Sequence, residues 1–314
     1  NRNVQSHCDK KEGDALQSEF EPQHPPQHRP VRKTGYRRRR RRTRRLWGLV
    51  FLAVLLLLCL LLFSRCLSGR TEQPVTAEPS EFNGTVLAVG DTPLYPLPTA
   101  PPYTILLDAG HGGTDVGANG IVKESEMTQR IVEDLQTWLL NDSNYAPVLS
   151  HASGENASIG DRADASNTAK AALLVSIHGN YDTAESSYGF ECFATPPGRL
   201  YHGRALTFAH AVADGMQNAG ARLRGTTGVR YAYYVPSGEN YRKEMVEESD
   251  LSTRSELTFG VIEKVNCPAV LIEQAFVTNA NDVQMWCGEN GSANAARIYY
   301  EAICTYFGTP PISS

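Results

Sequence analysis

The chain has 314 residues and a formal net charge of −4, which allows one domain of ordinary size together with additional segments. The charge is unevenly distributed, because residues 1–45 hold 14 of the 30 Lys and Arg but only five of the 34 Asp and Glu. None of the seven cysteines belongs to a C-x-x-C pair, which argues against a cysteine-ligated zinc ribbon and a thioredoxin-like redox site.

Residues 1–45 predict a disordered, basic tail. Residues 1–36 are rich in Gln, Pro, His and charge, and they contain few large apolar side chains that could offset the ordering entropy of a fold. The arginine run between Arg37 and Arg45 is compatible with nucleic acid or with anionic lipid. The apolar stretch that follows favours lipid, and we expect no nucleic-acid partner.

Residues 46–63, LWGLVFLAVLLLLCLLLF, form an uncharged stretch of 18 residues that predicts a transmembrane helix. A helix needs about this length to cross a hydrocarbon core of roughly 30 Å. The preceding arginines predict a cytoplasmic N-terminus and an extracytoplasmic C-terminal part, hence a single-pass protein of the cell membrane. A cleaved signal peptide is the alternative, but the preceding region is long and no A-x-A-like site follows.

The remaining chain predicts a linker and one folded domain. Residues 64–102 are rich in Pro, Thr and Glu, which is typical of an extended linker. In residues 103–314, short apolar runs alternate with helical patterns, which predicts a single three-layer α/β domain with a mostly parallel central sheet flanked by helices. Strands are expected at 103–107, 147–150, 173–177, 189–193 and 268–272, and helices at 125–141, 162–172, 202–218, 280–287 and 293–306.

Two histidines follow predicted strands. His111 lies in the glycine-rich turn DAGHGG (108–113), and His178 ends the apolar run 173–177. In open α/β sheets ligands gather beyond the carboxyl ends of strands, so both imidazoles are candidate site residues. Taken singly, His111 is equally well explained as a turn residue without a function, and a lone histidine at the position of His178 is more often a buried residue with satisfied hydrogen bonds.

Two glutamates extend this candidate set. Glu124 begins the predicted helix 125–141, where a carboxylate commonly interacts with the helix dipole, and Glu126 competes with it for any metal role. Glu273 ends an apolar run, where a carboxylate is costly unless it is paired or functional, and burial raises the pKa as a general base requires. Two His and one Glu form a catalytic zinc set that leaves one position for water, which a further carboxylate could deprotonate.

Four blocks of residues 105–282 resemble the catalytic domain of the zinc-dependent N-acetylmuramoyl-L-alanine amidases. The similarity extends over nearly the whole predicted domain, and GFE (189–191) is similar to a further strand of that family. The four blocks are LLDAGHGGTDVGANG (106–120), Glu124 followed by Thr128 and Ile131, DRADASNTAKAALLVSIHGN (161–180) and PAVLIEQAFVTNANDV (268–283).

The resemblance implies an activity and a role for each candidate residue. His111, Glu124 and His178 would bind one Zn2+, and Glu273 would be the catalytic carboxylate. Glu124 is implied rather than Glu126, because Thr128 and Ile131 then fall at the family's offsets. The implied reaction is hydrolysis of the amide bond between N-acetylmuramic acid and L-alanine in peptidoglycan, during remodelling of a bacterial cell wall. Whether a protein activator takes part stays open.

Other interpretations stay open at this stage. The chain could be a non-catalytic peptidoglycan-binding protein, or another zinc peptidase on a related scaffold. A carboxypeptidase would need an arginine for the terminal carboxylate of its substrate. Residues 231–257 look longer than the typical connection of the family and could form a lid, a substrate-selecting loop, an inhibitory element or an inert insertion. Arginines are available at Arg162, Arg222, Arg224 and Arg230, and four cysteines could pair or be buried singly: Cys192, Cys267, Cys287 and Cys304.

Overall fold

The computed structural model describes residues 93–313. The predicted tail (1–45), the predicted transmembrane helix (46–63) and most of the predicted linker (64–102) lie outside the described residues. Within 93–313, none of the helices combines the length and the apolar character that crossing a bilayer requires.

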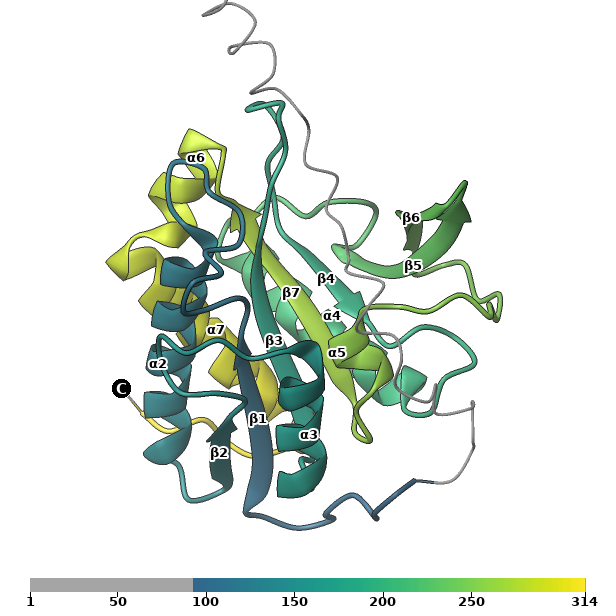
Figure 1. The fold of residues 1–314 in the computed structure, drawn as a ribbon. Helices are drawn as coiled ribbons and strands as arrows, with labels where there is room; N and C mark the ends of the chain where they lie inside the picture. The colour runs from purple at the N-terminus through teal and green to yellow at the C-terminus, as the bar shows by residue number, and fades with distance from the viewer. Residues whose placement is uncertain (1–92, 314) are drawn as a thin grey trace, which may run out of the picture. The chain divides into compact units, whose positions relative to one another are not determined.

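A seven-stranded sheet forms the centre of the described domain, with the strands in the order β2-β1-β3-β7-β4-β5-β6 (Figure 1). Each of the five runs that the sequence predicted as strands contributes to this sheet. The strands are β1 (Tyr103–Ala109), β2 (Tyr145–Leu149), β3 (Leu173–Asn180), β4 (Glu191–Ala194), β5 (Val229–Ser237), β6 (Asn240–Glu247) and β7 (Ala269–Phe276).

The expectation of a mostly parallel sheet needs a correction, because the sheet is mixed. Four neighbouring strands (β2, β1, β3 and β7) are parallel and so is the pair of β4 and β5, but β4 is antiparallel to β7 and β6 to β5. Connection length explains both reversals. Only residues 181–190 join β3 to β4, whereas a parallel return needs a crossover of about a dozen residues or more. Residues 238–239 alone join β5 to β6, which permits only a hairpin.

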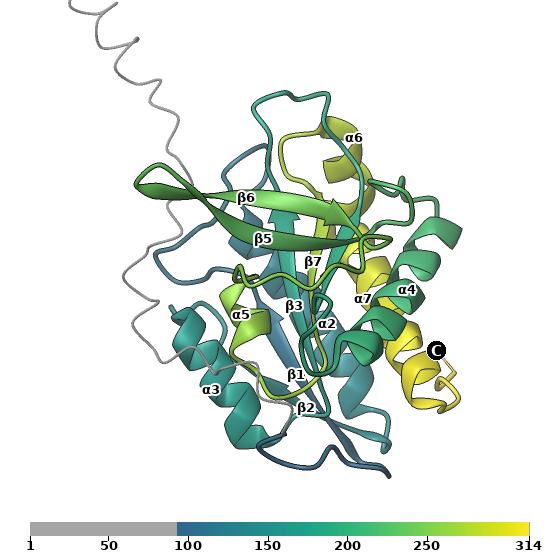
Figure 2. The same ribbon diagram turned by 90° about the vertical axis from the view of Figure 1, so that its right-hand side faces the viewer.

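Helices cover both faces of the sheet and give the predicted three layers (Figures 1 and 2). Side chains of β1 alternate between the two faces, since Ile105 and Leu107 join one buried cluster and Leu106 joins the other. One face is covered by α2 (Glu124–Leu140), α4 (His202–Asn218) and α7 (Glu289–Phe307), and the other by α3 (Ile159–Ala169) and α5 (Gly260–Glu263).

Local sequence signals account for the two helices nearest the candidate residues. Buried residues recur at helical spacing along α2, including Met127, Ile131 and Leu135. Helix α3 begins with a capping box, in which Ser158 accepts a hydrogen bond from the Asp161 amide and the Asp161 carboxylate accepts one from the Ser158 amide.

Three elements differ from the sequence expectation. The helix expected at 280–287 is a short α6 (Ala280–Asp282) that continues as a π-helix, η2 (Val283–Cys287). Neither α5 nor the β5–β6 hairpin was predicted, and the hairpin (229–247) makes up the larger part of the region 231–257 that looked longer than usual. Gly238 occupies the hairpin turn at a φ of 64°, a conformation that glycine adopts without strain.

The cysteines of the described domain are buried and unpaired: Cys192, Cys267, Cys287 and Cys304. Of the two options that the sequence left open, the structure therefore has the small buried side chains. Burial raises the pKa of the Cys267 thiol to about 12, so this thiol stays protonated at neutral pH.

Candidate active site

The four candidate residues lie at one end of the sheet. His111 follows β1 by two residues, Glu124 is the first residue of α2, and His178 and Glu273 belong to the neighbouring strands β3 and β7. His178 is the direct cross-strand partner of Glu273. Because β1, β3 and β7 are parallel, their carboxyl ends meet at the same edge, as the sequence argument expected.

Three of these residues form a compact cluster. The Nε2 atom of His111 lies 3.1 Å from Oε2 of Glu124, and Nδ1 of His178 lies 3.0 Å from Oε1 of the same carboxylate. One nitrogen or oxygen from each side chain lies within 4.8 Å of the other two, a separation compatible with a shared metal ion. Glu126 is outside this cluster, because it points to solvent and pairs with Lys123 at 2.6 Å.

Backbone amides and a glycine fix the orientation of Glu124. The amide of Ala118 donates to Oε2 at 2.8 Å, and the amide of Gly179 donates to Oε1 at 2.9 Å. A Cβ atom at Gly117 would lie 2.5 Å from the His111 ring and 2.6 Å from Oε2 of Glu124, so only glycine fits there. Burial raises the pKa of Glu124, but hydrogen bonds from His111 and His178 outweigh it and hold the pKa well below its usual range.

The second ring nitrogen of His111 has its own partner. Nδ1 lies 2.8 Å from Oδ2 of Asp115, which leaves Nε2 directed at Glu124. Burial lowers the pKa of His111, but the carboxylates of Glu124 and Asp115 outweigh this effect and raise it to about 9. A carboxylate behind a ligating imidazole is the usual arrangement in metal sites, where it fixes the ring orientation.

A buried ion pair between Arg162 and Asp108 supports the turn that contains His111. The Arg162 guanidinium donates to Oδ1 of Asp108 at 2.7 Å and to the carbonyls of Ala109 at 2.6 Å and His111 at 2.8 Å. His111 has a φ of 66°, which is uncommon for a residue other than glycine and needs such support. Burial raises the pKa of Asp108, but the charge of Arg162 and hydrogen bonds from the Ser150 and Ser176 hydroxyls have a larger opposite effect. The pKa is therefore lowered and the carboxyl group stays ionised.

Glu273 is buried beside the cluster, and its Oε2 atom has no hydrogen-bond partner among the described residues. A buried carboxylate oxygen without a partner is costly, so its retention here needs a functional explanation. Burial raises the pKa of Glu273, while Lys243 and His178 oppose this shift. A carboxyl group with a raised pKa is suited to exchange protons near neutral pH.

A second buried carboxylate lies next to Glu273. Glu191 of β4 is its direct cross-strand partner, and Arg230 and Asn180 donate to the Glu191 oxygens at 3.0 and 2.5 Å. Nε of Arg224 lies 3.2 Å from the same group. The sequence comparison had marked Glu191 only as part of a strand, whereas the structure shows a paired acid at the edge of the site.

The same contacts bear on the carboxypeptidase alternative. Arg162, Arg224 and Arg230 are all engaged with buried carboxylates of the protein. Arg222 donates to the Tyr188 carbonyl and lies over the Tyr188 ring. None of the four arginines that the sequence offered for a terminal carboxylate is therefore free among the described residues.

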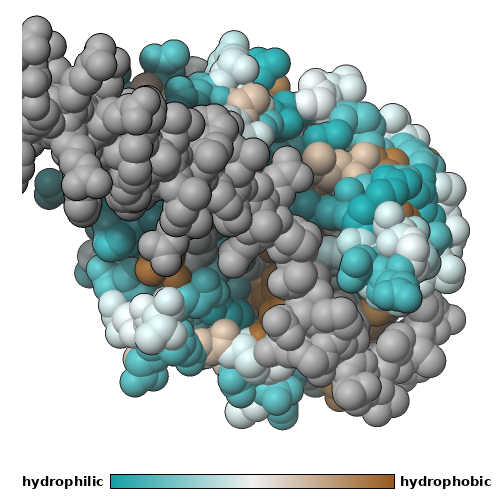
Figure 3. Space-filling model, turned by 45° about the horizontal axis from the view of Figure 1, so that its top comes forward, coloured by the Kyte–Doolittle hydropathy of each residue, from teal (hydrophilic) through white to brown (hydrophobic). Residues whose placement is uncertain are grey.

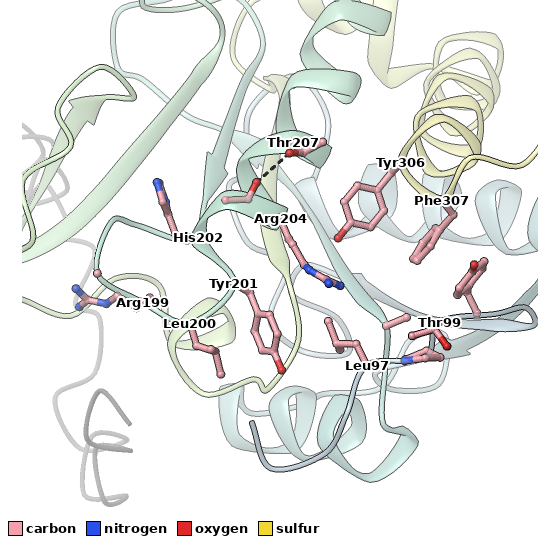
Figure 4. Close-up of a pocket in the computed structure, with 15 residues that line it drawn as sticks. Leu97, Thr99, Arg199, Leu200, Tyr201, His202, Arg204, Thr207, Tyr306 and Phe307 are labelled. Atoms are coloured by element: carbon pink, nitrogen blue, oxygen red, sulfur yellow. Dashed lines mark hydrogen bonds between the residues drawn. The ribbon is translucent and has the colours of Figure 1, made fainter. Parts of the chain in front are cut away.

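Two recesses lie at opposite ends of the sheet. One of about 290 Å3 is lined by loop residues that include Gly120, Tyr181 and Thr278, at the end that carries the cluster. A larger one, of about 1040 Å3, is lined by Tyr201, Arg204 and Phe307 among others (Figure 4). It lies at the amino ends of β1 and β3 and is lined by none of the four candidate residues.

Figure 3 brings the upper side of Figure 1 towards the viewer. The part of the surface drawn in colour there is mostly hydrophilic, with small hydrophobic patches.

Sequence reasoning identified the four central residues but not the groups that hold them. Asp108 and Asp115 fell inside the quoted blocks without a role, and Arg162 was considered only as a possible ligand of a terminal carboxylate. Their three-dimensional contacts assign all three to the support of the His111 turn. For Asp108, the signal that could have revealed it is a charged residue at the end of an otherwise apolar strand, the same signal that identified Glu273.

Comparison with known proteins identifies related sequences over the described domain. Residues 105–305 match the family model described as N-acetylmuramoyl-L-alanine amidase. The chain is 28% identical over 207 residues to the N-acetylmuramoyl-L-alanine amidase LytC of Bacillus subtilis, covering 65% of this chain and 35% of LytC. It is 30% identical over 183 residues to an endolysin of Bacillus phage SPP1, covering 58% of this chain and 57% of the endolysin.

Solved structures with the same fold come from the same group of proteins. The catalytic domain of the amidase CwlV from Bacillus (Paenibacillus) polymyxa superposes with a TM-score of 0.53 at 23% identity, over 66% of this chain and 99% of that domain. An N-acetylmuramoyl-L-alanine amidase of Clostridium difficile 630 gives 0.52 at 24% identity, over 66% and 97%. Because the family model matches more than half of this chain, the chain belongs to the N-acetylmuramoyl-L-alanine amidase family.

Proposed function

We propose that the domain hydrolyses the amide bond between N-acetylmuramic acid and L-alanine in peptidoglycan. One observation carries the proposal: His111, Glu124 and His178 converge within 4.8 Å beside Glu273, a buried carboxylate with an oxygen that lacks a partner. The identity of the substrate is inferred from family membership. The chain spans only 35% of LytC and 57% of the phage endolysin, so the activity of those proteins is a proposal for this one.

We infer that one Zn2+ would be held by His111, Glu124 and His178. Two imidazoles and one carboxylate are the nitrogen and oxygen donors of catalytic zinc sites, and each of these side chains already has an orienting partner. When bound, such an ion supplies a Lewis acid and lowers the pKa of a water molecule towards about 7.

The residues of the chain define the proton transfers. Oε2 of Glu273 is free to accept a proton from the water that attacks the lactyl carbonyl, because no described residue occupies that oxygen. The raised pKa of Glu273 then favours retention of the proton until it passes to the departing alanine nitrogen. Arg162 and Asp108 hold the His111 turn in place throughout.

The test is product analysis with purified peptidoglycan. The full chain is incubated with the polymer, alone, with a chelator, and with chelator followed by added zinc. We expect lactyl-ended glycan and peptides with a new N-terminal alanine, lost with the chelator and restored by zinc. Release of C-terminal amino acids instead would support the peptidase alternative, and peptidoglycan binding without any cleavage would support the binding-protein alternative.

The location of the domain is a separate proposal that rests on sequence alone. The apolar stretch 46–63 and its flanking arginines support a single membrane span with the domain on the extracytoplasmic side. Protease treatment of intact spheroplasts should then degrade the domain, whereas protection of the domain until lysis would contradict this orientation.

A further inference from the structure

The β5–β6 hairpin presents a tyrosine and a lysine side by side. Tyr234 of β5 and Lys243 of β6 are direct partners in the antiparallel register. Directly opposite residues of such a pair project from the same face, with Cβ atoms about 5 Å apart. The Tyr234 hydroxyl and the Lys243 ammonium group therefore belong to neighbouring side chains on one face of the hairpin. Lys243 is exposed to solvent.

Ring contacts place this pair over the face of the sheet that carries Glu273. Nζ of Lys243 lies 5.2 Å from the ring centroid of Phe259 and 6.0 Å from that of Phe193, and the Tyr234 ring lies 6.0 Å from Phe259. Phe193 follows Glu191 by two residues on β4, so both project from the same face, and Glu191 is paired with Glu273.

Electrostatic effects agree with this placement. The positive charge of Lys243 lowers the pKa of Glu273, against the larger effect of burial. Burial, with a contribution from the Glu273 carboxylate, raises the pKa of Tyr234 to about 12, so its hydroxyl stays protonated and able to donate. Both groups of the pair thus act within range of the catalytic carboxylate.

Lys243 differs from the other cations of the hairpin region because it has no anionic partner among the residues that the structure describes. Arg242 and Arg254 pair with Glu244 at 2.7 and 2.8 Å, and Arg230 pairs with Glu247 at 3.1 Å. No carboxylate oxygen of the described residues lies within 4.0 Å of the Lys243 ammonium. Its charge is therefore available to a ligand that enters the site.

We infer that Lys243, assisted by the Tyr234 hydroxyl, binds a carboxylate of the peptide stem next to the cleaved bond and so selects stems with a free carboxylate over amidated stems. The inference rests on the proposed amidase function. Glu191 and Glu124 are compensated by their own partners, but Glu273 is buried with one oxygen that no described residue pairs, and a stem carboxylate that enters beside it would be repelled. The Lys243 ammonium, which no carboxylate of the described residues neutralises, offsets that repulsion.

The experiment compares two substrates of the full chain that differ in one group. They are the disaccharide N-acetylglucosaminyl-N-acetylmuramic acid carrying L-alanyl-D-glutamate, and the same compound with the adjacent carboxyl amidated as D-isoglutamine. The measured quantity is the ratio of kcat/KM for the acid to kcat/KM for the amide. An effect of Lys243 on Glu273 alone would change both values equally, so the ratio isolates substrate recognition.

For Lys243→Met we expect this ratio to fall about tenfold, the usual effect of losing a charge-assisted contact. Lys243→Arg should retain most of the preference. Arg242→Gln removes the same charge from the adjacent position on the opposite face of β6, and should leave the ratio unchanged. An unchanged ratio in Lys243→Met, with both substrates still cleaved at the alanine amide, would overturn the inference and leave the amidase function intact. Cleavage of neither substrate by the unmodified chain would overturn both.

Discussion

The strand ends and the β5–β6 hairpin hold their charged residues in different ways. At the ends of β1, β3 and β7, the carboxylates of Asp108, Glu124 and Glu273 are all buried. Asp108 and Glu124 each have several partners, while one oxygen of Glu273 has none among the described residues. On the hairpin, ion pairs such as Arg242 with Glu244 are exposed, and Lys243 has no anionic partner within residues 93–313. A buried charge costs desolvation free energy and therefore needs partners in a defined geometry. An exposed ion pair contributes little to stability and can rearrange easily. This contrast suggests that the strand ends perform the chemistry and that the hairpin adjusts recognition.

The largest effect is expected from Glu273→Gln. Loss of the carboxylate removes the proton acceptor, which should lower kcat by about 10²- to 10⁴-fold while Zn2+ binding persists, because Glu273 is not a ligand. Turnover of peptidoglycan and metal content of the purified variant check both statements. Loss of the metal together with activity would contradict the division of roles at the strand ends.

Arg162→Met tests whether the strand ends depend on the buried ion pair. Removal of the guanidinium leaves Asp108 charged and buried, which is expected to cost about 3–5 kcal/mol in the free energy of unfolding. Arg222→Met is the matched control, because the Arg222 side chain forms no ion pair with a described residue and contacts the Tyr188 carbonyl and ring near the surface. Chemical denaturation measures both. Equal losses in the two variants would show that the pair with Asp108 has no special role.

Asp115→Ala tests the support of a proposed ligand from the exposed side. Removal of the carboxylate behind His111 should weaken Zn2+ binding about tenfold, the lower end of the effect of such partners, because Asp115 is largely exposed. Competition with a chelator of known affinity provides the measurement. Glu126→Ala removes an acid from the same region outside the cluster and should not alter the affinity.

The smallest effect is expected on the hairpin. Arg254→Gln removes the partner of Glu244 and Asp250, but these ion pairs are accessible to solvent and screened by salt. We expect little change in Tm and little change in turnover. A fall in Tm as large as that of Arg162→Met would mean that the hairpin is part of the cooperative core, and the contrast between the two regions would fail.

Particular residues show how far the sequence could predict the fold. The apolar runs that became β1, β3 and β7 and the helical spacing of α2 were readable, because burial imposes a period on the residues themselves. The mixed direction of the strands was not predicted, although the connection of only ten residues between β3 and β4 is too short for a parallel crossover. The hairpin was missed because its outer strand β6, NYRKEMVE, is largely exposed and has no apolar face that alternates clearly.

The residue types and their order along the chain were sufficient to name His111, Glu124, His178 and Glu273 as candidates. Which groups contact one another became visible in the folded domain alone. Asp115 lies behind His111, Arg162 lies beneath its turn, and Lys243 reaches Phe193 and Phe259 from a strand some 50 residues away in sequence from β4. The periodicity of apolar residues within one helix or strand indicates which of its faces is buried. The pairing of charges depends instead on distances between residues of different elements, and no short stretch of sequence contains that information.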